Sequence, residues 1–321
     1  MPALESLRTA VGALLEAPVL FVAGLAYGLI LFPQTLVQLI GVPIAPFLLQ
    51  VLTFFITPFV VAGLIGMADE AIADGRTGLG SLTDVGRERY VPLLLGNLIQ
   101  FGIVLDFLVV FVVVALAGAV TLGLGGAAVG GAGLAGGALV LLAVVGLLVL
   151  AFIVVSFFIQ FYQVAIVAGE ADAVDGYRES LSLVRANVVA TLGYSVVSLA
   201  VSILTSVPVT GFVLWRSLQR SGELAGAGGA GTGTAPGGFG PMAGGTGASA
   251  MGSLFSTTEA VALALVTLAT AMVLTTFQQT YATAFYRRHE GQRSIEERVL
   301  DDEAALGETS TESDGWSGSS E

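Results

Sequence analysis

Residues 156–193, SFFIQFYQVAIVAGEADAVDGYRESLSLVRANVVATLG, decide the fold of this chain. The stretch begins in an apolar helix that ends near residue 168. It continues through a short charged amphipathic segment and enters a second apolar helix near residue 188. About 20 apolar residues are enough for an α-helix to cross the hydrocarbon core of a bilayer. The stretch therefore predicts two membrane-spanning helices joined by an amphipathic segment.

The rest of the chain has the same character. Its 321 residues are 55% hydrophobic and only 11% charged, whereas a soluble domain carries roughly 25% charged residues. We predict an all-α, polytopic membrane helical bundle over residues 1–288, with an interfacial helix at residues 1–16. The six predicted crossings are at about 18–40, 47–67, 91–122, 138–168, 188–215 and 257–286.

Three segments without long apolar runs complete the predicted domain organisation. The Gly-rich stretches 123–137 and 216–253 are predicted to be extracellular loops, the second of them disordered. Residues 289–321 contain ten acidic residues and are predicted to form a disordered cytoplasmic tail.

The positions of the arginines predict the orientation. All 12 basic residues are Arg, and ten of them precede the first helix, lie between helices 2 and 3 or 4 and 5, or follow the sixth. Basic residues accumulate on the cytoplasmic side of membrane proteins. We therefore expect a multi-pass protein of the cell membrane with both termini in the cytoplasm.

The net charge of −12 favours a halophilic, haloarchaeal source, because surface carboxylates keep proteins hydrated in concentrated salt. The alternative is a mesophilic protein with an acidic tail. No basic patch is present to neutralise phosphates, so a nucleic-acid partner is not expected.

An internal repeat is indicated by residues 53–62, 156–165 and 275–284. Each follows the pattern hydroxyl, x, Phe, x, polar, x, aromatic, x, x, Ala without gaps. We interpret the chain as three hairpin units in the same orientation, each an interfacial segment followed by two crossings. The alternative is coincidence within the limited residue alphabet of membrane helices.

The amphipathic segment resembles one in a group of six-helix membrane families. These include the membrane domain of some glycerophosphodiester phosphodiesterases and haloarchaeal relatives of unknown function. The matching positions are Ala173, Tyr177, Ser180, Leu181, Leu183, Arg185 and Asn187. No phosphodiesterase catalytic domain is present, so the resemblance implies a fold and a location but no activity.

Asp106 is the strongest single candidate for a functional residue. A carboxylate within an apolar run is costly and is by default a functional-site hypothesis. It could carry protons or bind an ion, it could form a structural hydrogen bond, or its helix could lie shallower than expected. A candidate intramembrane polar site comprises Asp106, Gln160, Tyr162, Gln163, Gln279 and Tyr281. The alternative is that these polar side chains join neighbouring helices.

A candidate cytoplasmic interface lies in the amphipathic segment and comprises Tyr177, Arg178, Ser180, Arg185 and Asn187. Its arginines could bind lipid headgroups or a phosphorylated ligand, or could simply anchor the segment at the membrane surface. Gly24 and Gly28 form a Gly-xxx-Gly pattern that predicts close helix contact.

The sequence argues against enzymatic chemistry. The chain has no Cys and a single histidine, His289, so no catalytic triad or metal site is expected. Gly-x-Gly-x-x-Gly matches occur in Gly-rich loops that no strand precedes, so no cofactor is expected. We predict a non-enzymatic scaffold or accessory protein whose partners are the lipid bilayer and other membrane proteins. The alternative is a small transporter or channel; an intramembrane hydrolase is the weakest hypothesis. The sequence does not identify a small-molecule substrate.

Overall fold

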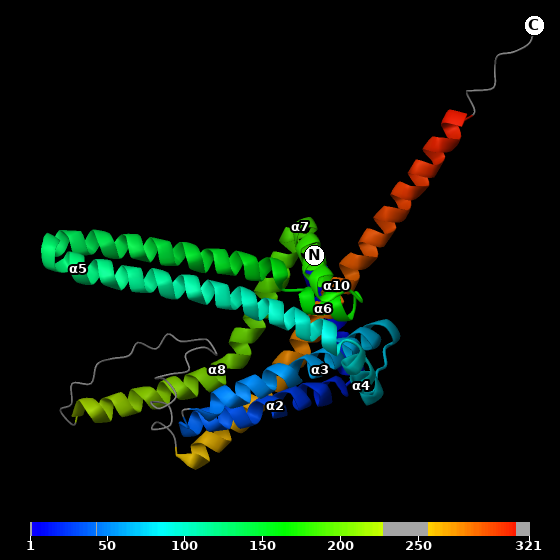
Figure 1. Ribbon diagram of the computed structural model, residues 1–321. Helices are drawn as coiled ribbons and strands as arrows, with labels where there is room; N and C mark the ends of the chain where they lie inside the picture. The colour runs from blue at the N-terminus through cyan, green and yellow to red at the C-terminus, as the bar shows by residue number, and fades with distance from the viewer. Residues whose placement is uncertain (1, 43, 227–255, 313–321) are drawn as a thin grey trace, which may run out of the picture.

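The computed structural model describes residues 2–42, 44–226 and 256–312, and every regular element within them is an α-helix (Figure 1). The helices are α1 (Pro2–Glu16), α2 (Leu20–Ile40), α3 (Ala45–Asp74), α4 (Leu79–Glu88), α5 (Tyr90–Ile159), α6 (Tyr162–Val167), α7 (Ala173–Ala186), α8 (Val188–Gly226) and α10 (Thr257–Glu312).

Six stretches in the described part of the chain are long and apolar enough to cross a membrane, which confirms the predicted helical class and number of spans. They are Leu20–Ile40, Ala45–Asp74, Tyr90–Val120, Gly137–Val167, Val188–Arg216 and Thr257–Glu290. In Figure 1 they extend from a common end at which α1, α4, α6 and α7 gather.

The helix α5 holds one of these spans and most of the next, because it doubles back at its far end (Figure 1). The two arms run side by side, and the Phe107 and Phe152 rings meet edge to face with centroids 5.4 Å apart. The predicted loop 123–137 thus lies within the bounds of α5, at its reversal. We call α5 with its two arms the α5 hairpin.

Helices α2 and α3 form a second hairpin, and α10 packs along it. Gly41 ends α2 and Gly75 ends α3, both in the left-handed conformation with φ of 82° and 70°, which glycine adopts without strain. A Cβ on Gly24 would collide with Thr276 of α10, and one on Gly28 would lie 3.2 Å from the Leu268 carbonyl oxygen. The close helix contact predicted from these glycines is confirmed.

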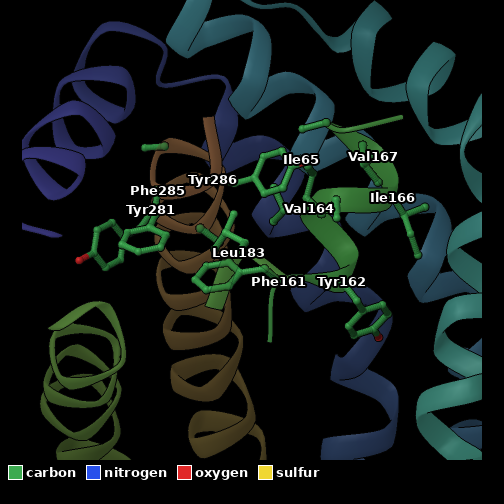
Figure 2. Close-up of a cluster of buried hydrophobic side chains, with 14 of the residues drawn as sticks. Ile65, Phe161, Tyr162, Val164, Ile166, Val167, Leu183, Tyr281, Phe285 and Tyr286 are labelled. Atoms are coloured by element: carbon green, nitrogen blue, oxygen red, sulfur yellow. The ribbon is translucent and has the colours of Figure 1, made fainter. Parts of the chain in front are cut away.

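The main hydrophobic core lies at the common end of the spans (Figure 2). Phe161, next to α6, stacks on Phe285 of α10 with ring centroids 5.1 Å apart, and Leu183 of α7 is buried beside them. In contrast, the α5 hairpin is almost unburied: the most apolar windows of its two spans are 6% and 0% buried. Tertiary packing therefore fixes the common end more firmly than the tips of the spans.

Equivalent positions of the three proposed repeats meet in this core. The shared alanines Ala62, Ala165 and Ala284 all belong to the same buried cluster, at 0%, 0% and 4% exposure. Each repeat-bearing helix packs most closely on a different short helix among the described residues: α3 on α4, α6 on α7, and α10 on α1. The internal repeat stays a prediction, but its copies occupy related places.

Several helix ends differ from the predicted ones. The fourth span is interrupted at Gln160–Phe161, because the Phe161 N–H donates to Ser180 Oγ at 3.2 Å. Helix α8 continues to Gly226, so residues 216–226 of the predicted loop are helical, and residues 227–255 lie outside the described part of the chain.

The last helix differs most. Instead of ending at 286, α10 continues to Glu312, into the segment predicted to be disordered, where Glu, Arg, Ala and Leu are good helix formers. His289 is buried rather than part of a solvated tail, with Nδ1 2.8 Å from the Phe285 carbonyl oxygen. Residues 313–321 lie outside the described part of the chain.

Candidate functional site

A cavity of about 240 Å³ lies between α6, α8 and α10. Its polar lining residues are Gln160, Gln163, Tyr194, Ser198, Gln278 and Gln279. Val164 and Ala282 complete the lining, and none of the lining residues carries a charge. We call this space the polar cavity. It brings together three residues of the predicted intramembrane polar site, from two spans 116 residues apart in the chain.

The polar cavity is held by hydrogen bonds between the spans. Gln279 Nε2 donates to Gln163 Oε1 at 3.4 Å, which joins α10 to α6. Ser195 Oγ of α8 donates to Gln160 Oε1 at 3.1 Å, whereas Gln160 Nε2 is buried without a hydrogen-bond partner among the described residues. The wall therefore has an uncompensated donor, and burying such a group costs free energy.

Tyr162 belongs to the polar network but not to the cavity lining. Its hydroxyl accepts a hydrogen bond from Gln163 Nε2 at 3.1 Å. On its other side it lies 2.7 Å from Asn97 Oδ1 and within hydrogen-bonding distance of Gln100 Oε1, both on α5. One phenolic proton can serve only one of these acceptors at a time. Tyr162 thus connects the α5 hairpin to the cavity wall.

Tyr281 also lies outside the cavity lining. Its side chain is fully buried, and its hydroxyl donates to the Ala3 carbonyl oxygen of α1 at 3.1 Å. Its ring packs against Tyr194 with centroids 4.6 Å apart. These contacts make Tyr281 a packing residue that fixes α1 against the bundle.

Asp106 stands apart from all of these residues. Its side chain is exposed on the first arm of α5, and no hydrogen bond or ion pair to another described residue is found for it. It does not line the polar cavity. The structure therefore separates the predicted intramembrane site into a cavity between three helices and an isolated carboxylate.

The predicted cytoplasmic interface is divided in the same way. Ser180 is buried, and its hydroxyl donates to the Phe158 carbonyl oxygen at 2.9 Å. The Tyr177 ring stacks on Tyr162 with centroids 4.6 Å apart, and its hydroxyl donates to the Gly96 carbonyl oxygen at 2.7 Å. Burial raises the pKa of the Tyr177 hydroxyl, so it stays protonated at neutral pH.

The remaining three residues of this set lie at the end or on the outer side of α7. The backbone N–H of Asn187 caps the helix by donating to the Leu183 carbonyl oxygen at 3.1 Å. Arg178 and Arg185 are exposed, and Arg178 pairs with Asp175 at 3.0 Å. Of the five residues in the predicted interface, only Arg178 and Arg185 are therefore exposed, as a binding surface requires.

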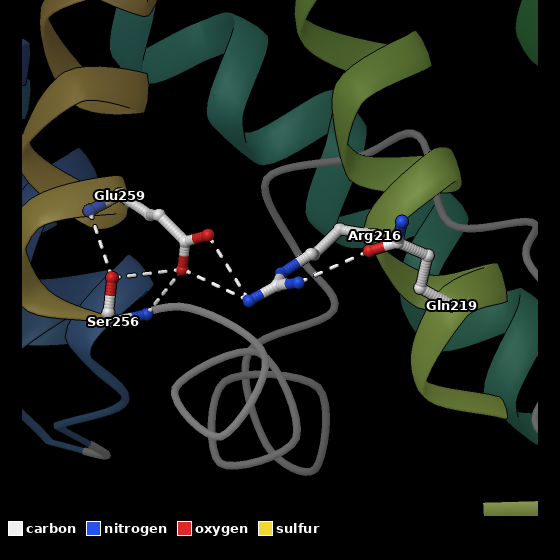
Figure 3. A network of polar contacts seen from close by, with 4 residues as sticks. All are labelled: Arg216, Gln219, Ser256 and Glu259. Atoms are coloured by element: carbon white, nitrogen blue, oxygen red, sulfur yellow. Dashed lines mark hydrogen bonds and ion pairs between the residues drawn. The ribbon is translucent and has the colours of Figure 1, made fainter. Parts of the chain in front are cut away.

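A polar cluster at the opposite end of the spans was missed in the sequence (Figure 3). Ser256 and Glu259 form a capping box at the start of α10: the Ser256 N–H donates to Glu259 Oε2 at 2.8 Å, and the Glu259 N–H to Ser256 Oγ at 3.3 Å. Arg216 of α8 pairs with Glu259 at 3.2 Å. The Ser-x-x-Glu spacing was the available signal.

The cavity itself also contains residues that sequence reasoning did not assign to it. Tyr194 and Ser198 face it from α8, and Asn97 and Gln100 extend its network onto α5. Asn97 and Gln100 could have been found in the sequence, because two amide side chains three residues apart within an apolar run lie on one face of a helix.

Residues 1–289 match the model of a domain of unknown function, DUF7847. The chain belongs to this family. The match covers α1 through the buried part of α10, which is the whole helical bundle, and ends where α10 leaves it. The six apolar helices of the described residues start within the matched region, and they are compatible with a membrane protein. No curated protein and no solved structure gives a significant match to the chain.

Proposed function

We propose that this chain is a non-enzymatic integral membrane protein that scaffolds or assists another membrane protein, which it binds through the first arm of the α5 hairpin. The observation that carries the proposal is Asp106, an exposed carboxylate on an apolar span with no partner among the described residues.

The position of Asp106 makes an uncovered state costly. It lies 16 residues beyond Tyr90, near the middle of the 31-residue span Tyr90–Val120, and a span of that length exceeds the hydrocarbon core of about 30 Å at both ends. Charged residues inside a membrane normally face a bundle interior or pair with another group. A transmembrane helix that carries Arg or Lys would supply this pairing.

The surface around Asp106 suits the approach of a helix. Gly102 lies one turn before it, and a Cβ there would meet nothing within 4 Å. Val109 and Val113 continue the same face at i+3 and i+7 and are 53% and 58% exposed. Small residues beside a polar group allow close helix contact in membranes. A second copy of this chain has no Lys, and no Arg lies between residues 90 and 159, so a different protein is the better partner.

We place the protein in the cell membrane with both termini in the cytoplasm. The ten arginines in the segments predicted to lie on the cytoplasmic side support this orientation. The net charge of −12 and the absence of Lys support a haloarchaeal source. The resemblance of the α7 segment to six-helix membrane families, including the phosphodiesterase membrane domain, is compatible with the same location.

Site-specific photo-crosslinking tests the scaffold proposal. A photoreactive residue at Val109 should capture one membrane protein whose transmembrane segment contains Arg or Lys, and Asp106→Asn should abolish this product. The matched control is Leu204, which is 73% exposed on α8 and should crosslink to lipid alone. Crosslinking of Val109 to lipid alone, or to a second copy of the chain, would contradict the proposal.

Transport of a small molecule is the second candidate function. The polar cavity favours it, because it lies at a helix junction within the spans. Asp106 does not line this cavity, so the cavity does not place a solute against that carboxylate. Solute flux into proteoliposomes that contain the purified chain would test this candidate, and flux equal to that of empty liposomes would exclude it.

A further inference from the structure

We infer that the polar cavity between α6, α8 and α10 is a binding site for a small, uncharged, polyhydroxylated solute. This inference depends on the cavity alone and on neither candidate function above. A failure to bind such a solute would leave the partner site at Asp106 untouched, and the reverse also holds.

The polar cavity lies below the charged rim of the bundle. Arg287 marks the charged rim of α10, eight residues beyond Gln279, so the cavity lies about 12 Å inside that rim along the helix axis. At this depth the surrounding lipid offers no hydrogen bonds, and polar groups must find partners within the protein or in a filled cavity. A cavity with polar walls therefore favours water or a polar ligand as its occupant.

The walls of the polar cavity are polar but uncharged. They hold carboxamides and hydroxyls, with Gln160 Nε2 as a donor that no described residue satisfies. None of the lining side chains is charged, so an ionic ligand would remain unpaired at a high desolvation cost. A hydroxyl group both donates and accepts hydrogen bonds, which fits a wall that offers both kinds of atom.

The size and shape of the polar cavity suit a small ligand. A volume of about 240 Å³ is below the roughly 300–1,000 Å³ of pockets for drug-sized ligands, so the cavity suits a smaller molecule. The Tyr194 side chain lines one side of the cavity, with its ring held between Phe161 and Tyr281 at centroid distances of 4.9 and 4.6 Å. An aromatic ring among polar groups is suited to the C–H face of a short polyol. Erythritol, with four carbons and four hydroxyls, is small enough for this space and matches the chemistry of its walls.

The test is saturation-transfer NMR on the full chain in lipid nanodiscs with erythritol as the probe. Wild-type protein should give an erythritol signal above that of empty nanodiscs, and choline and lactate at equal concentration should not compete. Gln160→Leu removes the unsatisfied donor, and Ala282→Leu fills the space. Gln160→Leu should weaken binding about tenfold, the value of one lost hydrogen bond to a bound ligand. Ala282→Leu should weaken binding at least as much, because the larger side chain occupies the space of the ligand.

The matched controls are Gln50→Leu on α3 and Ala143→Leu on α5, which are exposed and outside the cavity; both should bind erythritol as the wild type does. Helical circular dichroism identifies the variants that remain folded. The absence of a wild-type signal would show that the cavity holds water only and would overturn the inference. Equal competition by choline or lactate, or unchanged binding in a folded Gln160→Leu or Ala282→Leu variant, would also overturn it.

Discussion

Arg287 of α10 donates hydrogen bonds to both carboxylate oxygens of Asp69 on α3. Its Nη2 lies 2.6 Å from Oδ2, and its Nε donates to Oδ1. The two residues are 218 positions apart, so this pair closes the common end of the bundle by joining its last span to its second. Two parallel hydrogen bonds between a guanidinium and a carboxylate are among the stronger polar contacts in proteins.

Asp69→Asn should destabilise the folded protein by about 1 kcal/mol, because the pair is bidentate but partly exposed. Thermal unfolding in detergent, followed by circular dichroism, measures the change. The control is Asp175→Asn, which breaks the exposed pair with Arg178 within α7. A larger effect from Asp175→Asn than from Asp69→Asn would contradict the role assigned to Arg287.

Gly24→Ala should destabilise the contact between α2 and α10. The added Cβ would lie 2.6 Å from the Met272 carbonyl oxygen and collide with Thr276, and overpacking of this kind costs about 1–3 kcal/mol. Gly12→Ala is the matched control, since a Cβ there meets nothing within 4 Å inside α1. That substitution should stabilise by up to about 1 kcal/mol through helix propensity. If both variants shift the unfolding temperature in the same direction, the packing argument is wrong.

Ser180→Ala should destabilise the junction of α5, α6 and α7. It leaves the buried Phe161 N–H without its acceptor and removes the donor to the Phe158 carbonyl oxygen, a loss of about 1–3 kcal/mol. Ser182→Ala on the exposed side of the same helix is the control. Amide hydrogen exchange at Phe161 should accelerate in Ser180→Ala alone; unchanged protection there would contradict the assignment.

Increasing salt should stabilise the whole protein. A net charge of −12 repels itself, and screening reduces this repulsion as the Debye length falls to about 3 Å at 1 M salt. The unfolding temperature should therefore rise between low and molar KCl. Lowering the pH toward the ordinary pKa range of carboxylates protonates these groups and reduces the net charge, so the salt effect should become smaller. An unfolding temperature that does not depend on salt would show that the acidic excess does not limit stability.

The spans were predictable because each follows from one local property, a run of about 20 apolar residues. The contact at Gly24 was predictable for the same reason, since small residues four apart favour close helix packing. The environment of Asp106 was not, because it depends on how α5 is rotated relative to the other spans. The break at Phe161 was missed because its cause, Ser180, lies 19 residues away.

The polar cavity shows the same limit at the candidate site. Gln160, Gln163 and Gln279 could be selected as polar residues within apolar runs. Tyr194 and Ser198 complete the wall only because α8 packs on α10 and bonds to Gln160 just before α6. Tyr162 and Tyr281 have the same sequence signature as the cavity glutamines, yet their hydroxyls bind α5 and α1 instead. Sequence spacing identifies polar groups but does not show which of them share a cavity.

We propose that the six spans leave α4 and α7 on the cytoplasmic side and the end of α8 outside. The chain has no Cys, so single cysteines can be placed at the exposed positions Gly80 in α4, Ser182 in α7 and Gln219 in α8. A membrane-impermeant maleimide should label Gln219→Cys in intact cells, and Gly80→Cys and Ser182→Cys only after permeabilisation. Labelling of Ser182→Cys or Gly80→Cys in intact cells would contradict the membrane topology and the orientation on which the proposed function depends.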